Sequence, residues 1–98
     1  MRGLVEGSGK MDMKPICKFY GMWFKVCIGI GSTTKKCLPL CDPEDPDPNK
    51  VYSTKIEARE TSVSNGSLMR VTPLAVWCSK LTNAEVEKAT KADASITH

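Results

Sequence analysis

The sequence predicts an all-α protein, and three observations lead to this fold class. Apolar residues between residues 15 and 27 recur at the spacing of one helix face. Residues 82–85, Thr-Asn-Ala-Glu, form a capping box directly before a second stretch of helical spacing. Segments with the alternating pattern of a strand are weak, and no internal repeat is visible. A chain of 98 residues forms one domain or part of one.

The first third of the chain contains the first expected helix. Residues 1–12 are rich in glycine and charge, and we expect them to form a loose leader. The aromatic content of residues 15–27 still allows a strand, but an apolar stripe favours a helix. That stripe consists of Ile16, Phe19, Tyr20, Trp23 and Phe24. After two glycines, a short helix is expected over residues 33–40, where Pro39 and Pro43 end it.

The middle of the chain is expected to be a long Pro/Asp-rich loop over residues 41–60. Residues 41–50 read Cys-Asp-Pro-Glu-Asp-Pro-Asp-Pro-Asn-Lys. Three closely spaced prolines argue against a helix and remove backbone donors. Residues 51–63 are polar and poorly periodic, so they form either a hairpin-like excursion or more loop.

The last third contains two expected helices. The small polar cluster at residues 64–67 precedes an apolar pattern that runs to about Cys78. Pro73 falls within this pattern, so it lies in the first turns or kinks the helix. A second helix follows the capping box, and Glu87 and Lys91 form a favourable i,i+4 pair on it.

Charge and cysteine content exclude several classes of function. Residues 1–36 carry seven Lys and Arg against two acidic residues, but these cations are scattered singly. We therefore expect no nucleic-acid partner, with a small basic interaction module in residues 1–36 as the alternative. No apolar run is long enough to span a membrane, and we see no signal peptide. We expect a monomeric, cytoplasmic protein with no membrane partner.

The five cysteines are expected to be reduced thiols. Their number is odd and no secretory signal accompanies them, which argues against a disulfide framework. Cys37 and Cys41 are four residues apart, but no second pair follows them. The sole histidine is His98, the last residue, so the pattern of a zinc site is missing.

Residues 64–67, Ser-Asn-Gly-Ser, are the candidate binding loop. They stand at the start of an expected helix, where free backbone amides and the helix dipole favour an anion. Gly66 allows a ligand to approach the backbone, and Arg70 could add a positive charge one turn later. Ser and Asn are also ordinary helix caps, and an arginine at this spacing is often solvated or paired, so both interpretations stay open.

Two regions of the chain contain segments that resemble the ADP-ribosylglycohydrolase family. Residues 64–77 read Ser-Asn-Gly-Ser-Leu-Met-Arg-Val-Thr-Pro-Leu-Ala-Val-Trp, and residues 93–98 read Asp-Ala-Ser-Ile-Thr-His. They are similar to the family's Ser/Thr-Asn-Gly-small-x-Met-Arg loop and its later Thr-His. Upstream, Tyr-Gly-Met-Trp at 20–23 and Ile-Gly-Ser-Thr-Thr-Lys at 30–35 also resemble the family pattern. The resemblance covers residues 17–36 and 61–98.

This resemblance implies a compact all-α bundle that removes ADP-ribose from modified proteins or small acceptors. It implies two divalent cations, Mg²⁺ or Mn²⁺, that assist hydrolysis of the glycosidic bond. The matching positions would make Ser64, Asn65, Gly66 and Ser67 line the diphosphate and ribose site, with His98 beside the same ligand. Gly31 and Thr33 are weaker candidates for the wall of the pocket.

The sequence also departs from the family pattern. The family's metal ligands come from a Thr-Asp-Asp motif upstream and an Asp-x-Asp-Thr/Ser motif downstream, and this sequence contains neither. We reject Asp45-Pro46-Asp47-Pro48 as a substitute, because it precedes the loop and lacks the hydroxyl residue. We therefore expect residues 1–98 to form a single incomplete domain of this fold, with no metal ligand and no catalytic residue. The alternative is a catalytically inactive ADP-ribose-binding or crystallin-like structural protein.

Overall fold

The structure is a computed structural model that describes residues 2–7 and 10–98. These residues contain helices and no strand, which confirms the predicted fold class. None of the helices in this part of the chain is long and apolar enough to cross a membrane. In order, the elements are α1 (Arg2–Glu6), α2 (Met13–Phe24), α3 (Ser32–Cys37), the 3₁₀ turn η1 (Leu38–Leu40), α4 (Pro48–Ser53), α5 (Glu57–Thr61), α6 (Gly66–Met69), α7 (Thr72–Trp77), the 3₁₀ turn η2 (Cys78–Lys80) and α8 (Asn83–Ala94).

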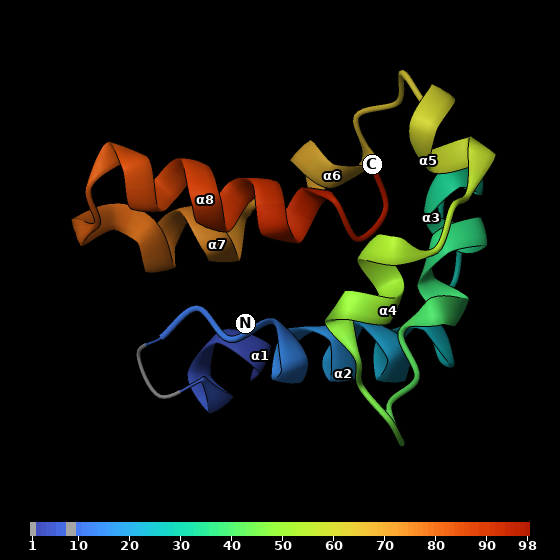
Figure 1. Cartoon of the computed structure of the whole chain (residues 1–98), viewed down its shortest axis with the longest axis horizontal. Helices are drawn as coiled ribbons and strands as arrows, with labels where there is room; N and C mark the ends of the chain where they lie inside the picture. The colour runs from blue at the N-terminus through green and yellow to red at the C-terminus, as the bar shows by residue number, and fades with distance from the viewer. Residues whose placement is uncertain (1, 8–9) are drawn as a thin grey trace.

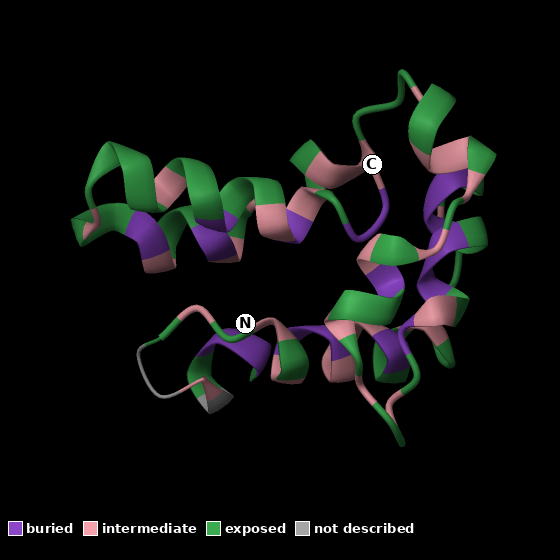
Figure 2. Cartoon of the chain, in the orientation of Figure 1, coloured by how far each residue is buried: buried purple, intermediate pink, exposed green. Residues whose placement is uncertain are grey.

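The helices form two arms joined along one side (Figure 1). One arm contains α1 and α2, and the other contains α7 and α8, while α3, α4 and α5 connect them. Buried residues line the inner sides of both arms and also lie on α3 and α4 (Figure 2). The radius of gyration is 12.8 Å, close to the value of about 13 Å expected for a folded chain of this length.

Helix α2 covers the segment for which a strand was the alternative, so the strand interpretation is wrong. The carboxylate of Asp12 accepts a hydrogen bond of 3.0 Å from the Lys14 amide and caps the first turn. Pro15 lies in that first turn, where a backbone donor is not needed. Ile16 and Cys17 are buried against the core, which fixes the face that α2 presents to the other helices.

Gly21 in the middle of α2 permits a close crossing of the chain. A Cβ atom at this position would lie 1.9 Å from the carbonyl oxygen of Cys41, at the end of η1. Any other residue would therefore push the segment that follows η1 away from α2. Gly21 is buried, and the absence of a side chain sets the spacing between these two parts of the chain.

The expectation of a loose leader over residues 1–12 is wrong for the part of it that the structure describes. Residues 2–6 form α1, and Leu4 on this helix is buried in the core cluster. Gly3 lies directly against α2, because a Cβ there would be 2.6 Å from the Cα of Ile16. Residues 1, 8 and 9 of the expected leader lie outside the described residues. Burial of Leu4 supplies the stabilisation that composition alone did not reveal.

The expectation of a continuous loop over residues 41–60 is also wrong. Residues 41–47 are irregular, but α4 and most of α5 lie within the range. Pro48 occupies the first helical position of α4, where its missing N–H costs nothing. Asp47 caps the same helix by accepting from the Lys50 amide at 3.2 Å. The last proline of the run therefore starts a helix instead of preventing one, and Val51 is buried by it.

The apolar pattern up to Cys78 forms two short helices where one was expected. Helix α6 ends at Met69, and α7 begins at Thr72. Pro73 lies in the first turn of α7, which was one of the two placements considered. Proline cannot donate to the carbonyl of Met69, four residues before it, and its ring crowds that carbonyl. The chain therefore turns at Arg70, and this turn directs the Arg70 side chain into the molecule.

Helix α8 confirms the predicted capping box. The Glu85 amide donates to the Thr82 hydroxyl at 3.3 Å, and the Glu85 carboxylate accepts from the Thr82 amide at 2.9 Å. The Glu87–Lys91 pair is also present, on the exposed side of the helix. Asp93 near the end of α8 is buried, which is unusual for a carboxylate and requires partners.

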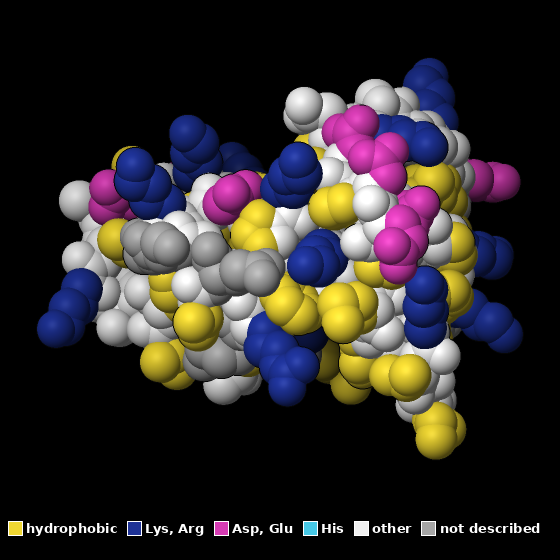
Figure 3. Space-filling model, turned by 90° about the horizontal axis from the view of Figure 1, so that it is seen from below, with side chains coloured by type: hydrophobic (Ala, Val, Ile, Leu, Met, Phe, Trp, Pro, Cys, Tyr) yellow, Lys and Arg dark blue, Asp and Glu magenta, His cyan; other side chains and the backbone are white. Residues whose placement is uncertain are grey.

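The core is small, and part of the apolar surface remains exposed. The largest fully buried side chains are Leu38, Ile96, Val51, Thr97, Cys17 and Cys37. The exposed apolar side chains include Val5, Met22, Trp23, Val26, Ile28, Val63, Leu68, Met69 and Val76. Figure 3, which views the molecule from below, shows Lys and Arg side chains spread among hydrophobic and acidic ones.

Candidate functional site

The structure brings the two halves of the candidate site together. Ser64 and His98 are 34 residues apart in sequence, yet the Ser64 hydroxyl and Nε2 of His98 are 2.8 Å apart. Gly66 lies against the same ring, because a Cβ there would be 2.9 Å from Cε1 of His98. A side chain at position 66 would displace the histidine, so this glycine is what permits the contact.

The remaining loop residues stand at the solvent boundary. Ser64 and Asn65 are exposed, and Gly66 and Ser67 are partly buried. Asn65 is the N-cap of α6, but its side chain makes no capping bond. The first backbone amides of a helix have no partner inside the helix. The amides of residues 66–68 are therefore donors that a ligand at this surface can use.

A chain of hydroxyl groups supports Ser64 from behind. Ser62 Oγ accepts from the Thr33 hydroxyl at 2.9 Å and from the Ser64 amide at 3.2 Å. A hydroxyl has two acceptor positions, so Ser62 must donate its own hydrogen to Ser64 Oγ, 3.0 Å away. Ser64 Oγ is then left with its own proton to direct toward His98 or toward a ligand.

Helix α3 contributes the wall of the site beside this chain. Thr33 is buried, and its hydroxyl donates to Ser62. Thr34 comes as close, since its hydroxyl would be 3.4 Å from a Cβ on Gly66. Gly31 is exposed with open space around it, and the structure does not bring it to the loop. The positions of Ser62 and Thr34 in the sequence did not indicate that they lie near the loop, because only the packing of α3 and α5 brings them to it.

His98 is held in place on both sides of its ring. Nε2 contacts Ser64, and Nδ1 is 2.8 Å from the hydroxyl of Thr97. Burial lowers the pKa of His98 below its ordinary value, and the positive charge of Arg70 lowers it further. The ring is therefore neutral at pH 7 and can exchange hydrogen bonds without adding a charge.

Arg70 is a structural residue and not the free charge that the loop spacing allowed. Its Nε donates to the Tyr20 hydroxyl at 3.0 Å, its Nη1 to the Thr97 hydroxyl at 2.7 Å and its Nη2 to the Asp93 carbonyl at 3.0 Å. The carboxylate of Asp93 lies 3.7 Å from Nε. All three nitrogens of the guanidinium group are thus occupied, which agrees with the alternative of a paired arginine.

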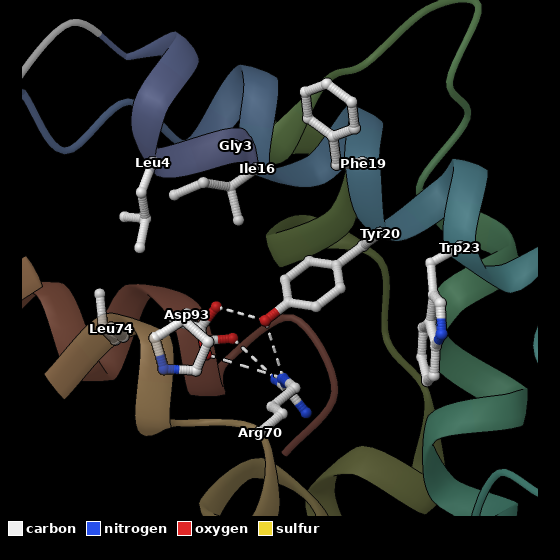
Figure 4. A pocket seen from close by; sticks show the side chains of 10 residues that line it. Gly3, Leu4, Ile16, Phe19, Tyr20, Trp23, Arg70, Leu74 and Asp93 are labelled. Atoms are coloured by element: carbon white, nitrogen blue, oxygen red, sulfur yellow. Dashed lines mark hydrogen bonds and ion pairs between the residues drawn. The ribbon is translucent and has the colours of Figure 1, made fainter. Parts of the chain in front are cut away.

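Tyr20 completes this buried cluster (Figure 4). Its hydroxyl donates to the Asp93 carboxylate at 2.7 Å, and burial and that carboxylate raise the pKa of Tyr20. The cluster borders a cavity of about 390 Å³ that is otherwise walled by apolar residues of α1, α2 and α7. Ser64, Asn65, Gly66, Ser67 and His98 do not line this cavity, and its polar groups are already paired with one another.

His98 also faces a shallow cleft of about 460 Å³. Its walls include Arg59 and also Lys91, whose ammonium group is paired with Glu87. The Arg59 guanidinium donates to the carbonyls of Val51 and Ile96, at 2.8 and 3.1 Å, and thereby fixes the cleft wall. The electrostatic setting suits an anion, although α6 has only four residues and its dipole adds less than a longer helix would.

Within the part of the chain that the structure describes, the carboxylates do not provide a site for a divalent cation. In residues 2–7 and 10–98, no group of three or more His, Cys, Asp or Glu side chains is placed to hold a metal. Asp47 caps α4, and Asp93 is engaged by Tyr20 and Arg70. Mg²⁺ and Mn²⁺ need several oxygen ligands, so the residues present do not fit the metal pair that the family resemblance implies. The arrangement is suited to binding an anionic, hydroxyl-bearing ligand.

Comparisons with known proteins bear on the whole chain. Neither the curated proteins nor the solved structures contain a match to it. The model of one protein family, described as ADP-ribosylglycohydrolase, matches residues 1–98. The match extends beyond the two segments that carry the sequence resemblance and includes the residues that form α1, α4 and η1. The chain therefore belongs to the ADP-ribosylglycohydrolase family.

Proposed function

We propose that this chain binds the diphosphate and ribose of an ADP-ribosyl group through Ser64, Asn65, Gly66, Ser67 and His98. In this proposal the chain contributes to removing ADP-ribose from modified proteins or small acceptors. The observation that carries it is the 2.8 Å contact between Ser64 and His98, which joins the two halves of the motif at the surface. Family membership supports the choice of ligand.

The chemistry of the loop is complementary to a diphosphate. Phosphate oxygens accept hydrogen bonds, and the amides of residues 66–68 together with the hydroxyls of Ser64 and Ser67 are donors. The neutral ring of His98 provides a further donor or acceptor for a ribose hydroxyl. The cleft beside His98 offers room for the rest of the ligand, and the positive charge of Arg59 in its wall favours an anion.

The hydrolytic step is assigned to no residue of this chain. In the proposal, Mg²⁺ or Mn²⁺ would serve the family reaction, but the described residues bring no cluster of ligands together for either ion. A second candidate function is binding of ADP-ribose without turnover, as an inactive or crystallin-like protein. The engagement of Asp93 by Tyr20 and Arg70 favours it, because this buried carboxylate is not free to act on a ligand.

Titration calorimetry with ADP-ribose tests the binding proposal directly. We expect binding without added metal, weakened about 5- to 10-fold in Ser64→Ala and in His98→Ala, since each removes a side chain that can form hydrogen bonds with the ligand. Ser53→Ala is the matched control, because Ser53 is an exposed serine on α4 that bonds only to the local Lys50 carbonyl. ADP should bind and adenosine monophosphate should bind less well, because the loop is proposed to recognise the diphosphate. No heat from a demonstrably folded chain would end the proposal.

An activity assay separates the two candidate functions. The chain is incubated with Mg²⁺ or Mn²⁺ and a peptide carrying ADP-ribose on arginine or on serine, and released ADP-ribose is measured by chromatography. Release that is lost in Ser64→Ala but kept in Ser53→Ala supports hydrolysis. Binding with no release under any of these conditions supports the second function.

The proposed setting is the cytoplasm, with the chain as a monomer and ADP-ribosylated proteins or ADP-ribose-type small molecules as partners. The odd number of cysteines argues against a disulfide framework and supports a reducing compartment. Light scattering on a size-exclusion column tests the monomer, since a mass of about twice 10.7 kDa would exclude it. Filter binding that finds salt-dependent affinity for nucleic acid would instead favour the basic module in residues 1–36.

A further inference from the structure

Two of the five free cysteines share one place in the core. Cys17 lies on α2 and Cys41 directly follows η1, and their exposed fractions are 0% and 2%. Both belong to the cluster of buried apolar residues, which also contains Cys78. They come from elements that pack on each other, so their proximity is a property of the fold and not of sequence spacing.

The backbone geometry accounts for this proximity. Cys17 and Gly21 are one helical turn apart and therefore lie on the same face of α2. The carbonyl of Cys41 lies on Gly21, where a Cβ would be 1.9 Å from it. The backbone of residue 41 thus crosses α2 one turn from the Cys17 side chain.

The other cysteines are placed differently. The Cys37 thiol donates to the Thr97 carbonyl at 3.5 Å, and the Cys27 thiol donates to the Phe24 carbonyl at 3.3 Å. Cys78 is buried on η2, in the other arm of the molecule. Cys17 and Cys41 are therefore the pair that the fold favours for a chemical reaction between two thiols.

The two thiols also differ in acidity. The neighbouring Cys41 side chain lowers the pKa of Cys17 in spite of its burial. The neighbouring Cys17 side chain, together with burial, raises the pKa of Cys41. This difference makes Cys17 the better nucleophile of the two, because the thiolate is the reactive form.

We propose that Cys17 and Cys41 are a buried dithiol site that a hydroperoxide converts to a disulfide. In the first step the Cys17 thiolate attacks one oxygen of hydrogen peroxide, the O–O bond breaks, and hydroxide leaves. Cys17 is then a sulfenic acid, and the hydroxide takes up a proton to become water. In the second step the Cys41 sulfur attacks the Cys17 sulfur, the S–O bond breaks, and a second water leaves with the Cys41 proton. Two thiols are oxidised and one peroxide is reduced.

Such a bridge would close a segment of the chain that includes part of the candidate site. The closed segment from residue 17 to residue 41 contains all of α3, and α3 carries Thr33 and Thr34 to the binding loop. Closing the segment restricts the unfolded chain and so favours the folded one. This inference goes beyond the proposed ligand-binding function and does not depend on it.

Mass spectrometry of the full chain tests the proposal. The reduced chain is treated with hydrogen peroxide, quenched, unfolded and alkylated, and its intact mass is measured. We expect three of the five cysteines to be alkylated, a chain about 2 Da lighter before alkylation, and a peptide that joins Cys17 to Cys41. The midpoint of thermal unfolding should rise by about 10 °C and return on addition of dithiothreitol. Five alkylated cysteines after treatment, or a bridge between any other pair, would overturn the proposal.

Three variants test the separate roles of the two thiols. In Cys41→Ala, a sulfenic acid at Cys17 should be trapped by dimedone, whereas in Cys17→Ala, residue 41 should give no adduct. Cys78→Ala is the matched control and should still form the bridge. The same treatment of the wild-type chain in urea should give mixed pairings. If a variant fails to fold, the comparison between folded and unfolded wild-type chain still decides, since equal pairing patterns in the two states contradict the proposal.

Discussion

Replacing Arg70 by methionine should destabilise the chain strongly, because it leaves a buried carboxylate without its cation. The side chains of Arg70 and Asp93 are 17% and 8% exposed. Arg70 also holds the Tyr20 hydroxyl, the Thr97 hydroxyl and the Asp93 carbonyl. Removing one partner of a buried pair costs about 3–5 kcal/mol. The total stability of a domain is about 5–15 kcal/mol, so Arg70→Met should lose a large fraction of it.

Urea unfolding followed by far-ultraviolet circular dichroism measures this loss. Trimethylamine N-oxide is added equally to all samples, so that the variant keeps a folded baseline. Arg70→Lys should lose about 1–3 kcal/mol, because it keeps the charge but not the three-way geometry. Asp93→Asn combined with Arg70→Met should cost less than the sum of the single changes, since the two residues are coupled.

Lys91→Ala is the matched control for this prediction. Lys91 and Glu87 also form an ion pair, but their side chains are 74% and 65% exposed. An exposed i,i+4 pair contributes about 0.2–0.5 kcal/mol. If Arg70→Met and Lys91→Ala have the same small effect, the burial argument fails. The same result would show that Arg70 does not hold the turn between α6 and α7.

Three further predictions concern single residues. The pKa of His98 is lowered in the folded chain, so the unfolded chain binds a proton at higher pH than the folded chain does, and the free energy of unfolding should decline as the pH falls from about 6.5 toward 5. His98→Gln should remove this decline from the free energy of unfolding measured with urea at each pH. A wild-type profile that does not change over this pH range would contradict the placement of the ring. Gly66→Ala should displace His98, which would change the imidazole signal in nuclear magnetic resonance, and should lower the free energy of unfolding by about 1 kcal/mol. Gly31→Ala is the control and should leave that signal unchanged, because the space around Gly31 is open. Thr82→Ala removes the capping box of α8 and should lower the free energy of unfolding by about 1 kcal/mol. It should also return the pKa of Glu85 toward its ordinary value. An unchanged urea midpoint would show that the cap is not needed.

The helices that the sequence predicts best are those fixed by local interactions. The capping box at Thr82 and Glu85 involves residues three positions apart, so it can be recognised without knowledge of the fold. The apolar stripe of α2 likewise repeats within one helix. Both predictions are confirmed, since neither interaction depends on a distant part of the chain.

The elements that the sequence missed depend on distant partners. Helix α1 has five residues and is stabilised by burial of Leu4 against the core, which composition does not show. Helix α4 begins at the last of three prolines, and only the cap from Asp47 and the burial of Val51 distinguish this position from a loop. Short helices of this kind gain their stability from packing, so periodicity could not identify them.

The candidate site also combines residues that the sequence could indicate with residues that only the fold brings together. Residue type and the family resemblance pointed to Ser64 and His98, and the structure places them in contact, but their role in binding stays a prediction. Ser62 could not be found, because it reaches the site only through the packing of α5 on α3. Arg70 could not be assigned from spacing, because Tyr20 and Asp93, which hold it, lie 50 and 23 residues away.

The glycine in the Tyr-Gly-Met-Trp segment has a consequence for how the protein can evolve. Because a Cβ at Gly21 would meet a backbone oxygen at 1.9 Å, no rotamer change can relieve the clash. We expect random replacement of the codon for Gly21, with cells sorted for folded protein, to recover almost only glycine. The same experiment at the neighbouring Met22, which is 43% exposed, should recover most amino acids. One missing methyl group would thus hold this position invariant in any descendant that keeps the crossing of residue 41 over α2.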